Sequence, residues 1–325
     1  FGGGQTPSTT ATVSRIDYSN DTATASPKGS LTAARYGLGG VSGTDGGVNN
    51  TLTVPNTFPA INLVTGNYET AQTGYFGGST VDRIDYSNDT ATASPKGPLS
   101  LARYYLAATG NSSFGYFGGG FPGPRSTVDR IDYLNDTATA VAKGPLSAAR
   151  RYLAATGNSS FGYFGGGSPG PFSTVDRIDY SNDTATASVR GPLSLARYVL
   201  TATGNSNFGY FGGGFPGPRS TVDRIDYSND TATAVAKGPL SVAKNSLAAT
   251  GNSSFGYFGG GSPGPFSTVD RIDYSNDTAT ASPKGPLSAA RRYLAATGNS
   301  NFGYFGGGFP GPRSTVDRID YSNDT

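Results

Sequence analysis

The chain has 325 residues with 24 basic and 22 acidic side chains, and it contains no histidine, cysteine, methionine or tryptophan. These charges are spread evenly, so no basic stripe predicts a nucleic-acid partner, and no apolar run is long enough to predict membrane insertion. Because histidine and cysteine are missing, imidazole and thiolate metal ligands and disulfides are excluded, and we expect no cofactor. The 20 tyrosines and 18 phenylalanines provide material for a core between frequent glycine and proline turns.

An internal repeat organises the sequence. The tripeptide Ile-Asp-Tyr recurs every 47 residues from Asp85 to Asp320, after a first interval of 68 residues from Asp17. The longer interval predicts an insertion at about residues 37–73. The chain lacks an initiator methionine and opens with Phe1 in the middle of a repeat, so we expect a processed chain or a fragment of a longer array.

Each repeat divides into four short segments, as the copy that starts at Arg103 shows. A small-residue segment at 106–108 is followed by an aromatic one at 114–117, an alternating one at 127–133 and a fourth at 137–141. None of them has ten residues at a helical period. Four strands at a period in the forties predict an all-β fold, a β-propeller of four-stranded antiparallel blades. Seven Ile-Asp-Tyr copies predict seven blades in a single domain spanning residues 1–325.

The order of the repeat residues resembles the kelch family. Kelch repeats place an arginine before a small-residue strand, then an aromatic strand ending in a glycine pair, a strand ending in tyrosine, and a Pro-Leu-type exit. The same order is followed by Arg150, Tyr163-Phe164-Gly165-Gly166, Ile178-Asp179-Tyr180 and Gly191-Pro192-Leu193. The tryptophan usual after the tyrosine strand is replaced by Thr-Ala-Thr-Ala, so the repeats are kelch-like.

The amino-acid sequences of the repeats also resemble those of virion structural proteins of marine bacteriophages of the cyanophage type. The shared units are Tyr-Phe-Gly-Gly-Gly and Val-Asp-Arg-Ile-Asp-Tyr-Ser-Asn-Asp-Thr. This resemblance implies a tail or capsid appendage, located on the virion or outside the cell. Its partners would be other virion proteins or a cell-surface glycan or protein.

The glycines and aromatic residues of each repeat predict how blades meet. We expect the triplet Gly118-Gly119-Gly120 to let the inner strands converge round the axis, because glycine allows close backbone approach and positive φ. We expect Phe114, Tyr116 and Phe117 to supply the core between blades, with Tyr116 and Phe117 on opposite faces of their strand. A phosphate-binding glycine loop would need a following helix, which the sequence does not offer.

Asp129, Arg130 and Asp132 form an acid-base-acid pattern that recurs along the chain. Exposed charge ladders between blades explain it, with pairs worth about 0–1 kcal/mol each. Paired carboxylates for acid-base catalysis are the alternative, but catalysis needs one group that differs from its neighbours, and equivalent copies provide none. The pattern therefore favours a non-enzymatic protein.

The connectivity of an up-and-down blade predicts which loops share a face. The Thr-Gly-Asn-Ser-Ser and Tyr-Ser-Asn-Asp-Thr turns belong to one face. The other face holds the Pro-Leu-Ser connections and the loops that read Gly-Phe-Pro-Gly-Pro or Gly-Ser-Pro-Gly-Pro, called Gly-Pro-Gly-Pro loops below. The second face varies in alternate copies, where Phe-Pro-Gly-Pro-Arg exchanges with Ser-Pro-Gly-Pro-Phe at a 94-residue period. Exposed phenylalanine and arginine are typical of binding surfaces, although recent pairwise duplication also explains the alternation. The candidate binding residues are Phe121, Arg125, Phe172, Phe215, Arg219, Phe266, Phe309 and Arg313.

The insertion provides a second candidate. It holds Asp45 and Glu69, the acids outside the repeat pattern, and Glu69 is the only glutamate of the chain. Long loops in compact domains are usually functional or disordered, and a decayed blade segment is the other interpretation.

Three functions follow from these patterns. The first is a structural or binding module, a virion-associated appendage or adhesin that recognises a cell surface. The second is a free carbohydrate-binding lectin, which repeated aromatic sites would also suit. The third is a glycosidase, for which only Asp45 and Glu69 are distinctive acids; a copper oxidase is excluded by the missing histidine and cysteine.

Overall fold

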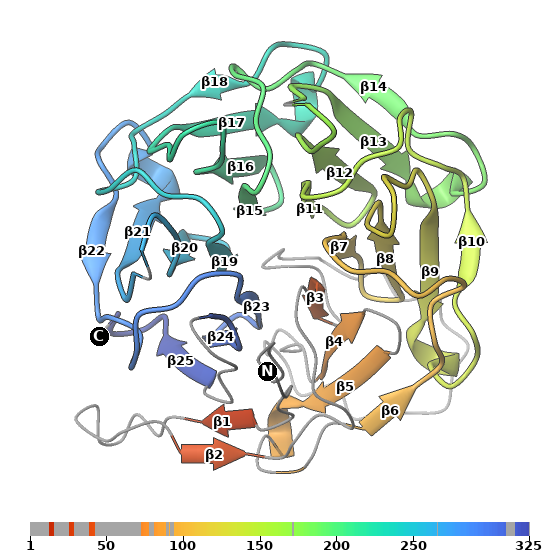
Figure 1. Ribbon diagram of the computed structural model, residues 1–325, viewed down its shortest axis with the longest axis horizontal. Helices are drawn as coiled ribbons and strands as arrows, with labels where there is room; N and C mark the ends of the chain where they lie inside the picture. Colours follow the sequence, from red (N-terminus) through yellow and green to blue (C-terminus); the bar gives the residue numbers. More distant parts are fainter. Residues whose placement is uncertain are drawn as a thin grey trace, which may run out of the picture.

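The repeats form separate sheets arranged round one axis (Figure 1). The computed structural model describes residues 13–15, 26–28, 39–42, 73–77, 81–88, 91, 94–170, 172–264, 266–309 and 316–324. In the sheets of three or four strands, all antiparallel, the strands follow chain order from the centre outward, so each of these sheets is one blade. This architecture is that of a β-propeller.

The blades are numbered in chain order. Blade 1 contains β3 (Gly39–Ser42), β4 (Thr73–Gly77), β5 (Val81–Asp85) and β6 (Ser94–Lys96), and blade 2 contains β7 (Ala107–Gly110), β8 (Phe114–Gly118), β9 (Val128–Asp132) and β10 (Val141–Lys143). Blade 3 contains β11 (Ala154–Gly157), β12 (Phe161–Gly165), β13 (Val175–Asp179) and β14 (Ser188–Arg190), and blade 4 contains β15 (Thr201–Gly204), β16 (Phe208–Gly212), β17 (Val222–Asp226) and β18 (Val235–Ala236). Blade 5 contains β19 (Ala248–Gly251), β20 (Phe255–Gly259), β21 (Val269–Asp273) and β22 (Ser282–Lys284), and blade 6 contains β23 (Ala295–Gly298), β24 (Phe302–Gly306) and β25 (Val316–Asp320).

A short 3-10 helix follows the third strand of blades 1 to 5. These helices are η1 (Tyr86–Asn88), η2 (Tyr133–Asn135), η3 (Tyr180–Asn182), η4 (Tyr227–Asn229) and η5 (Tyr274–Asn276). In blade 2, Asp132 accepts a hydrogen bond from the Leu134 backbone nitrogen, which caps the turn. The turn delays the fourth strand, which begins at Val141 and not at residue 137 as predicted.

Six blades close the ring, so the prediction of seven is wrong. The inner strand β23 of blade 6 lies beside β3 of blade 1. The same junction stacks Tyr304 on Tyr86 at 5.3 Å between ring centroids, and the Tyr86 hydroxyl lies 2.8 Å from the Thr297 hydroxyl. Direct contact between these inner strands leaves no place for a seventh.

The segment just before the first Ile-Asp-Tyr copy forms part of a peripheral hairpin. Strands β1 (Val13–Arg15) and β2 (Ser26–Lys28) pair with each other, and β1 lies against β25 at the outside of the ring. Counting Ile-Asp-Tyr copies therefore overcounts the blades by one, because β1 and β2 form a separate two-stranded sheet and add no blade to the closed circle of inner strands. Strand β3 falls inside the range expected for the insertion, and residues 43–72, which separate β3 from β4, lie outside the described residues.

The glycine triplets do not line the inner edge as predicted. The innermost strands described in blades 2 to 6 are Ala-Ala-Thr-Gly or Thr-Ala-Thr-Gly, whose short side chains permit the convergence. Gly118 instead ends the second strand, where an added Cβ would lie 2.6 Å from the Phe164 ring of the next blade. Gly119 and Gly120 adopt φ of 74° and 116°, which favours glycine.

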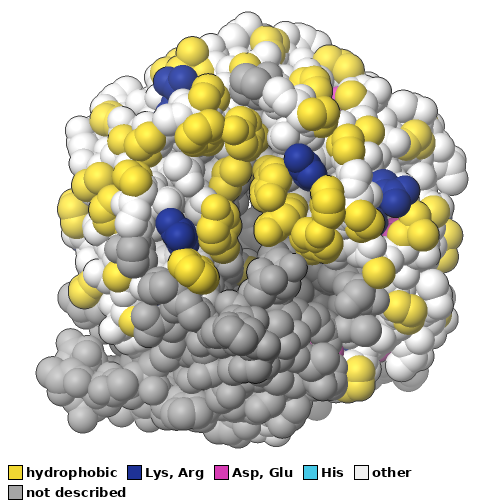
Figure 2. Space-filling model, in the orientation of Figure 1, with side chains coloured by type: hydrophobic (Ala, Val, Ile, Leu, Met, Phe, Trp, Pro, Cys, Tyr) yellow, Lys and Arg dark blue, Asp and Glu magenta, His cyan; other side chains and the backbone are white. Residues whose placement is uncertain are grey.

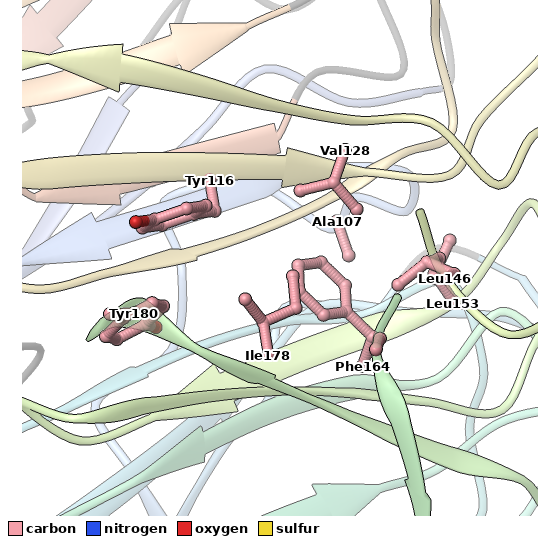
Figure 3. Close-up of a cluster of buried hydrophobic side chains, with 9 residues drawn as sticks. Ala107, Tyr116, Val128, Leu146, Leu153, Phe164, Ile178 and Tyr180 are labelled. Atoms are coloured by element: carbon pink, nitrogen blue, oxygen red, sulfur yellow. The ribbon is translucent and has the colours of Figure 1, made fainter. Parts of the chain in front are cut away.

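Aromatic residues of the second strand fill the space between blades, as predicted (Figure 3). Tyr116 of blade 2 shares a buried cluster with Phe164 and Ile178 of blade 3. Phe117 points the other way and packs with Tyr75 and Val81 of blade 1. Each such side chain contributes on the order of 2 kcal/mol or more by burial, and the repeat provides them at successive junctions.

Candidate binding face

The first aspartate of the Val-Asp-Arg-Ile-Asp segment is buried in its own blade. Asp129 is fully buried and accepts hydrogen bonds from Arg103 at 2.7 Å and from the Ser100 hydroxyl at 2.6 Å. Arg103, also buried, donates to the carbonyl oxygens of Gly119 at 2.7 Å and Thr127 at 2.8 Å. This pair fixes the connection before the inner strand to the glycine turn.

The arginine of the same segment locks adjacent blades together. Arg130 of blade 2 donates to Asp183 of blade 3 at 2.8 Å, and Tyr116 donates to the same carboxylate at 2.9 Å. Lys143 lies 3.2 Å from that carboxylate. Arg130 of the acid-base-acid pattern thus joins two blades, but its partner Asp183 lies outside the pattern, and Asp129 and Asp132 bond within their own blade. Asp183 is buried, so the magnitude of about 0–1 kcal/mol for exposed pairs does not apply to it. Strand alternation cannot distinguish a side that faces water from one that faces another blade.

The Gly-Pro-Gly-Pro loops and the connections that precede the inner strands share one face, as predicted. We call it the Gly-Pro-Gly-Pro face; its described loops are 119–127, 166–170, 172–174, 213–221, 260–264 and 266–268, and its connections are 97–106, 144–153, 191–200, 238–247 and 285–294. Each loop spans two blades. The Phe121 end pairs with Tyr104 of the same blade, and the Arg125 end pairs with Arg150 of the next blade. The loops are therefore held at both ends.

A belt of backbone hydrogen bonds joins the connections round the axis. The Tyr152 nitrogen donates to the Tyr105 carbonyl at 3.0 Å, and Val199, Ser246 and Tyr293 continue the series at 2.9, 3.1 and 2.8 Å. All five residues have a left-handed backbone, with φ between 55° and 58°. The belt fixes the backbone, so differences on this face come from the side chains.

The structure places the predicted binding residues on this face with unequal exposure. Phe215 is 38% exposed and Phe309 is 41% exposed. Phe121 is half-buried because Arg151 of the next blade lies over its ring, with Cζ 5.0 Å from the centroid. Arg125, Phe172, Arg219 and Phe266 are also half-buried. Arg313, Asp45 and Glu69 lie outside the described residues.

Sequence reasoning missed the residues of the connections that complete this face. Tyr104 packs on Phe121 at 5.0 Å, Tyr198 packs on Phe215 at 5.2 Å, and Arg292 lies 4.9 Å from the Phe309 centroid. A signal was present, because these positions vary between copies, as the positions on either side of them also do.

The Gly-Pro-Gly-Pro face combines aromatic and basic groups. Its described loops and connections contain no aspartate or glutamate. Figure 2 shows apolar side chains gathered round the central opening, with basic side chains among them. The face therefore suits a ligand that offers apolar surface together with hydrogen-bonding or negatively charged groups.

The comparisons with known proteins give information on the fold alone. No family model and no curated protein matches the chain. Among solved structures, the one titled "Structure of YjhT" is similar with a TM-score of 0.61 and 13% identity, covering 74% of this chain and 89% of that one. The protein is thus a six-bladed β-propeller, and the resemblances to kelch repeats and to bacteriophage virion proteins stay predictions.

Two further kinds of site, a metal centre and a membrane-spanning helix, have no support in the described part of the chain. There, no group of three or more acidic side chains is placed to hold a metal ion. Within the same residues, no helix is long and apolar enough to cross a membrane.

Proposed function

We propose that the chain is a non-enzymatic binding module whose Gly-Pro-Gly-Pro face recognises a cell-surface glycan, as part of a virion-associated appendage or adhesin. The observation that carries the proposal is the exposure of Phe215 and Phe309, at 38% and 41%, on loops held by two blades or by a neighbouring connection. Aromatic side chains on a rigid frame provide contact area without a large loss of conformational entropy on binding.

The charge of this face supports a glycan as the partner. Aromatic rings stack on the C–H faces of sugars, and the arginines between them donate hydrogen bonds to hydroxyl or acidic groups. A basic protein or peptide partner is disfavoured, because the described loops and connections offer it no carboxylate.

The placement of the repeated acids supports a non-enzymatic role. Asp129 and its copies are buried against arginine or lysine, and Asp183 and its copies are held by tyrosine and basic residues of the preceding blade. Acid-base chemistry needs a carboxylate that reaches a substrate. The alternative, a glycosidase that uses Asp45 and Glu69, rests on residues outside the described part.

A glycan array probed with the full chain tests the proposal. We expect the chain to bind a subset of cell-surface glycans, and the double variant Phe215→Ala with Phe309→Ala to lose that binding while it keeps the unfolding midpoint within a few degrees. The matched control carries Ser113→Ala, Ser160→Ala and Ser254→Ala, three exposed residues of the opposite face, and should bind as the parent does.

Two results would overturn the proposal. One is an array on which the chain retains no glycan, or on which only the serine control loses binding. The other is turnover of a glycoside that disappears with Glu69→Gln, which would put the enzyme first.

A further inference from the structure

Two junctions of the ring differ in a way that points to one ligand site. The 94-residue period makes the junction between blades 4 and 5 the equivalent of the junction between blades 2 and 3. Phe121 corresponds to Phe215 and Arg125 to Arg219. In the connections of the two junctions five positions change, where Tyr105, Ala148, Arg150, Arg151 and Tyr152 become Val199, Val242, Lys244, Asn245 and Ser246.

The junction between blades 2 and 3 is filled by its own side chains. The Arg151 guanidinium lies between two rings, with Cζ 5.0 Å from the Phe121 centroid and 5.5 Å from the Tyr152 centroid. Tyr152 in turn packs against Tyr105, with 4.3 Å between the ring centroids and the ring planes tilted by 32°. An electropositive, planar group therefore already covers the Phe121 ring.

The junction between blades 4 and 5 keeps the same backbone and removes that cover. The Ser246 nitrogen donates to the Val199 carbonyl at 3.1 Å, matching the bond of 3.0 Å from Tyr152 to Tyr105. Asn245 takes the place of Arg151 and is too short to lie over the ring of Phe215, and no described cation does so. Phe215 is 38% exposed, and Tyr198 packs edge-on against it at 5.2 Å.

Polar residues lie on the segments next to the Phe215 loop. The backbone of Asn245 forms a β-bridge with that of Ser262, and the backbone of Arg219 forms one with that of Lys244. The loop that holds Arg219, the connection 244–245 and the loop that begins at Ser262 are therefore adjacent. The side-chain Oδ1 of Asn245 accepts from the Ser246 hydroxyl at 2.8 Å, which leaves the side-chain NH₂ group to donate. The guanidinium of Arg219 forms no hydrogen bond or ion pair with a described residue, whereas Arg125 donates to the Pro122 carbonyl at 3.1 Å.

We infer that the junction between blades 4 and 5 is a binding site for one acidic pyranose. Phe215 stacks on the C–H face of the sugar ring, Asn245 and Ser262 hydrogen-bond its hydroxyls, and Arg219 pairs with its carboxylate or sulfate. This inference rests on the proposed function and names the ligand class and the place. At Phe215 the C–H groups of the sugar would present to the ring the weak positive charge that Arg151 presents to Phe121. A cationic ligand is disfavoured at the same place, because the positive charge of Arg219 would repel it.

Matched single variants locate the site. The probes are an array that pairs uronic-acid and sulfated glycans with their neutral parents, and then calorimetry with the tightest binder. The parent chain should bind one sugar per chain and prefer the acidic member of a pair. Phe215→Ala should weaken binding at least 10-fold, whereas Phe121→Ala, whose ring is already covered, should leave it within 2-fold. Arg219→Gln should remove the preference for the acidic glycan.

Exchange of the two junctions gives a test that does not depend on loss of function. The double variant Asn245→Arg with Ser246→Tyr restores the filled arrangement, so it should lose binding without a lower unfolding midpoint. The reverse variant, Arg151→Asn with Tyr152→Ser, uncovers Phe121 and should raise the stoichiometry from one to two.

The outcomes separate this inference from the proposed function. Binding that survives Phe215→Ala and is lost with Phe309→Ala would overturn the site and leave a glycan-binding face standing. Equal affinity for acidic and neutral members would overturn the role of Arg219. Retention of no glycan by the parent chain would overturn both.

Discussion

Lys244 lies 3.1 Å from Asp270 in the position where the other described connections hold a buried arginine. Its ammonium donates to the carbonyls of Phe258 and Thr268 at 3.4 and 3.3 Å, whereas the equivalent bonds of Arg103, to Phe117 and Thr127, measure 3.3 and 2.8 Å. Arg103 donates in addition to the Gly119 carbonyl at 2.7 Å. An arginine provides more donors in a fixed plane. We predict that Lys244→Arg raises the free energy of unfolding by about 1 kcal/mol, measured by urea denaturation.

The reciprocal change in blade 4 is the control for this prediction. Arg197 donates to Gly213 at 2.8 Å, to Thr221 at 2.9 Å and to Asp223 at 2.7 Å. Arg197→Lys should lower stability by a similar amount. A gain with Arg197→Lys, or a loss with Lys244→Arg, would contradict the explanation.

Asp183 predicts an acid-sensitive junction between blades 2 and 3. Burial raises its pKa, but hydrogen bonds from Tyr116 and Lys143 and the charge of Arg130 outweigh burial, so the pKa lies below its ordinary value. A depressed carboxyl pKa stabilises the fold above the unfolded pKa of about 4, and this contribution is lost as the pH falls through the folded value. Asp183→Asn should cost about 3 kcal/mol at pH 7, and the difference from the parent should shrink at pH 3 in urea denaturation.

Asp179 is a control for the acid prediction in the same turn. Its pKa is also below the ordinary value, chiefly because the Ser181 hydroxyl donates to it, but it lies at the surface. Asp179→Asn should change stability at pH 7 by well under the loss expected for Asp183→Asn. Equal losses would show that contact between blades is not the cause.

The stacked tyrosines predict a second transition in alkali. Tyr163 and Tyr227 stack at 4.7 Å, and burial raises the pKa of both; Tyr163 also donates to Asp230, whose charge raises its pKa further. A raised tyrosine pKa stabilises the fold below the unfolded value of about 10, and the contribution is lost as the pH rises through the folded value. Absorbance at 295 nm should therefore show a steep late step that coincides with loss of near-ultraviolet circular dichroism. A single smooth titration near pH 10, with the fold intact, would contradict this.

Repeat spacing predicts the strands, the two faces and the sides of Tyr116 and Phe117, because period-2 alternation and identical copies constrain them together. The sequence does not predict the number of blades, because a motif on the third strand does not show whether the same repeat also supplies an inner strand. Strand β3 reads Gly-Gly-Val-Ser where later copies read Ala-Ala-Thr-Gly, so it was hidden within the expected insertion.

The site could be predicted in part. The loops with phenylalanine and arginine stand out in the sequence, and the Lys244-Asn245-Ser246 departure is visible once the copies are aligned. Its meaning required the structure, because only the stacking of Arg151 on Phe121 shows what the shorter Asn245 uncovers. The buried aspartates were misjudged for a similar reason, since their neighbours come from other segments and other blades.

Substitution of glycine by alanine should lower the free energy of unfolding by different amounts at two positions. Gly144 precedes Pro145 in a connection, its nitrogen donates to the Asp183 carbonyl at 2.8 Å, and an added Cβ would overlap the Ala185 backbone carbonyl of the next blade. Gly123 has φ of 65° with nothing within 4 Å of an added Cβ. Gly123→Ala should therefore cost only the left-handed backbone, about 1 kcal/mol, whereas Gly144→Ala must push two blades apart and should cost more than about 3 kcal/mol. Urea midpoints of the two variants compare these costs directly. A greater loss with Gly123→Ala would mean that close approach between blades is not what requires glycine in the connection.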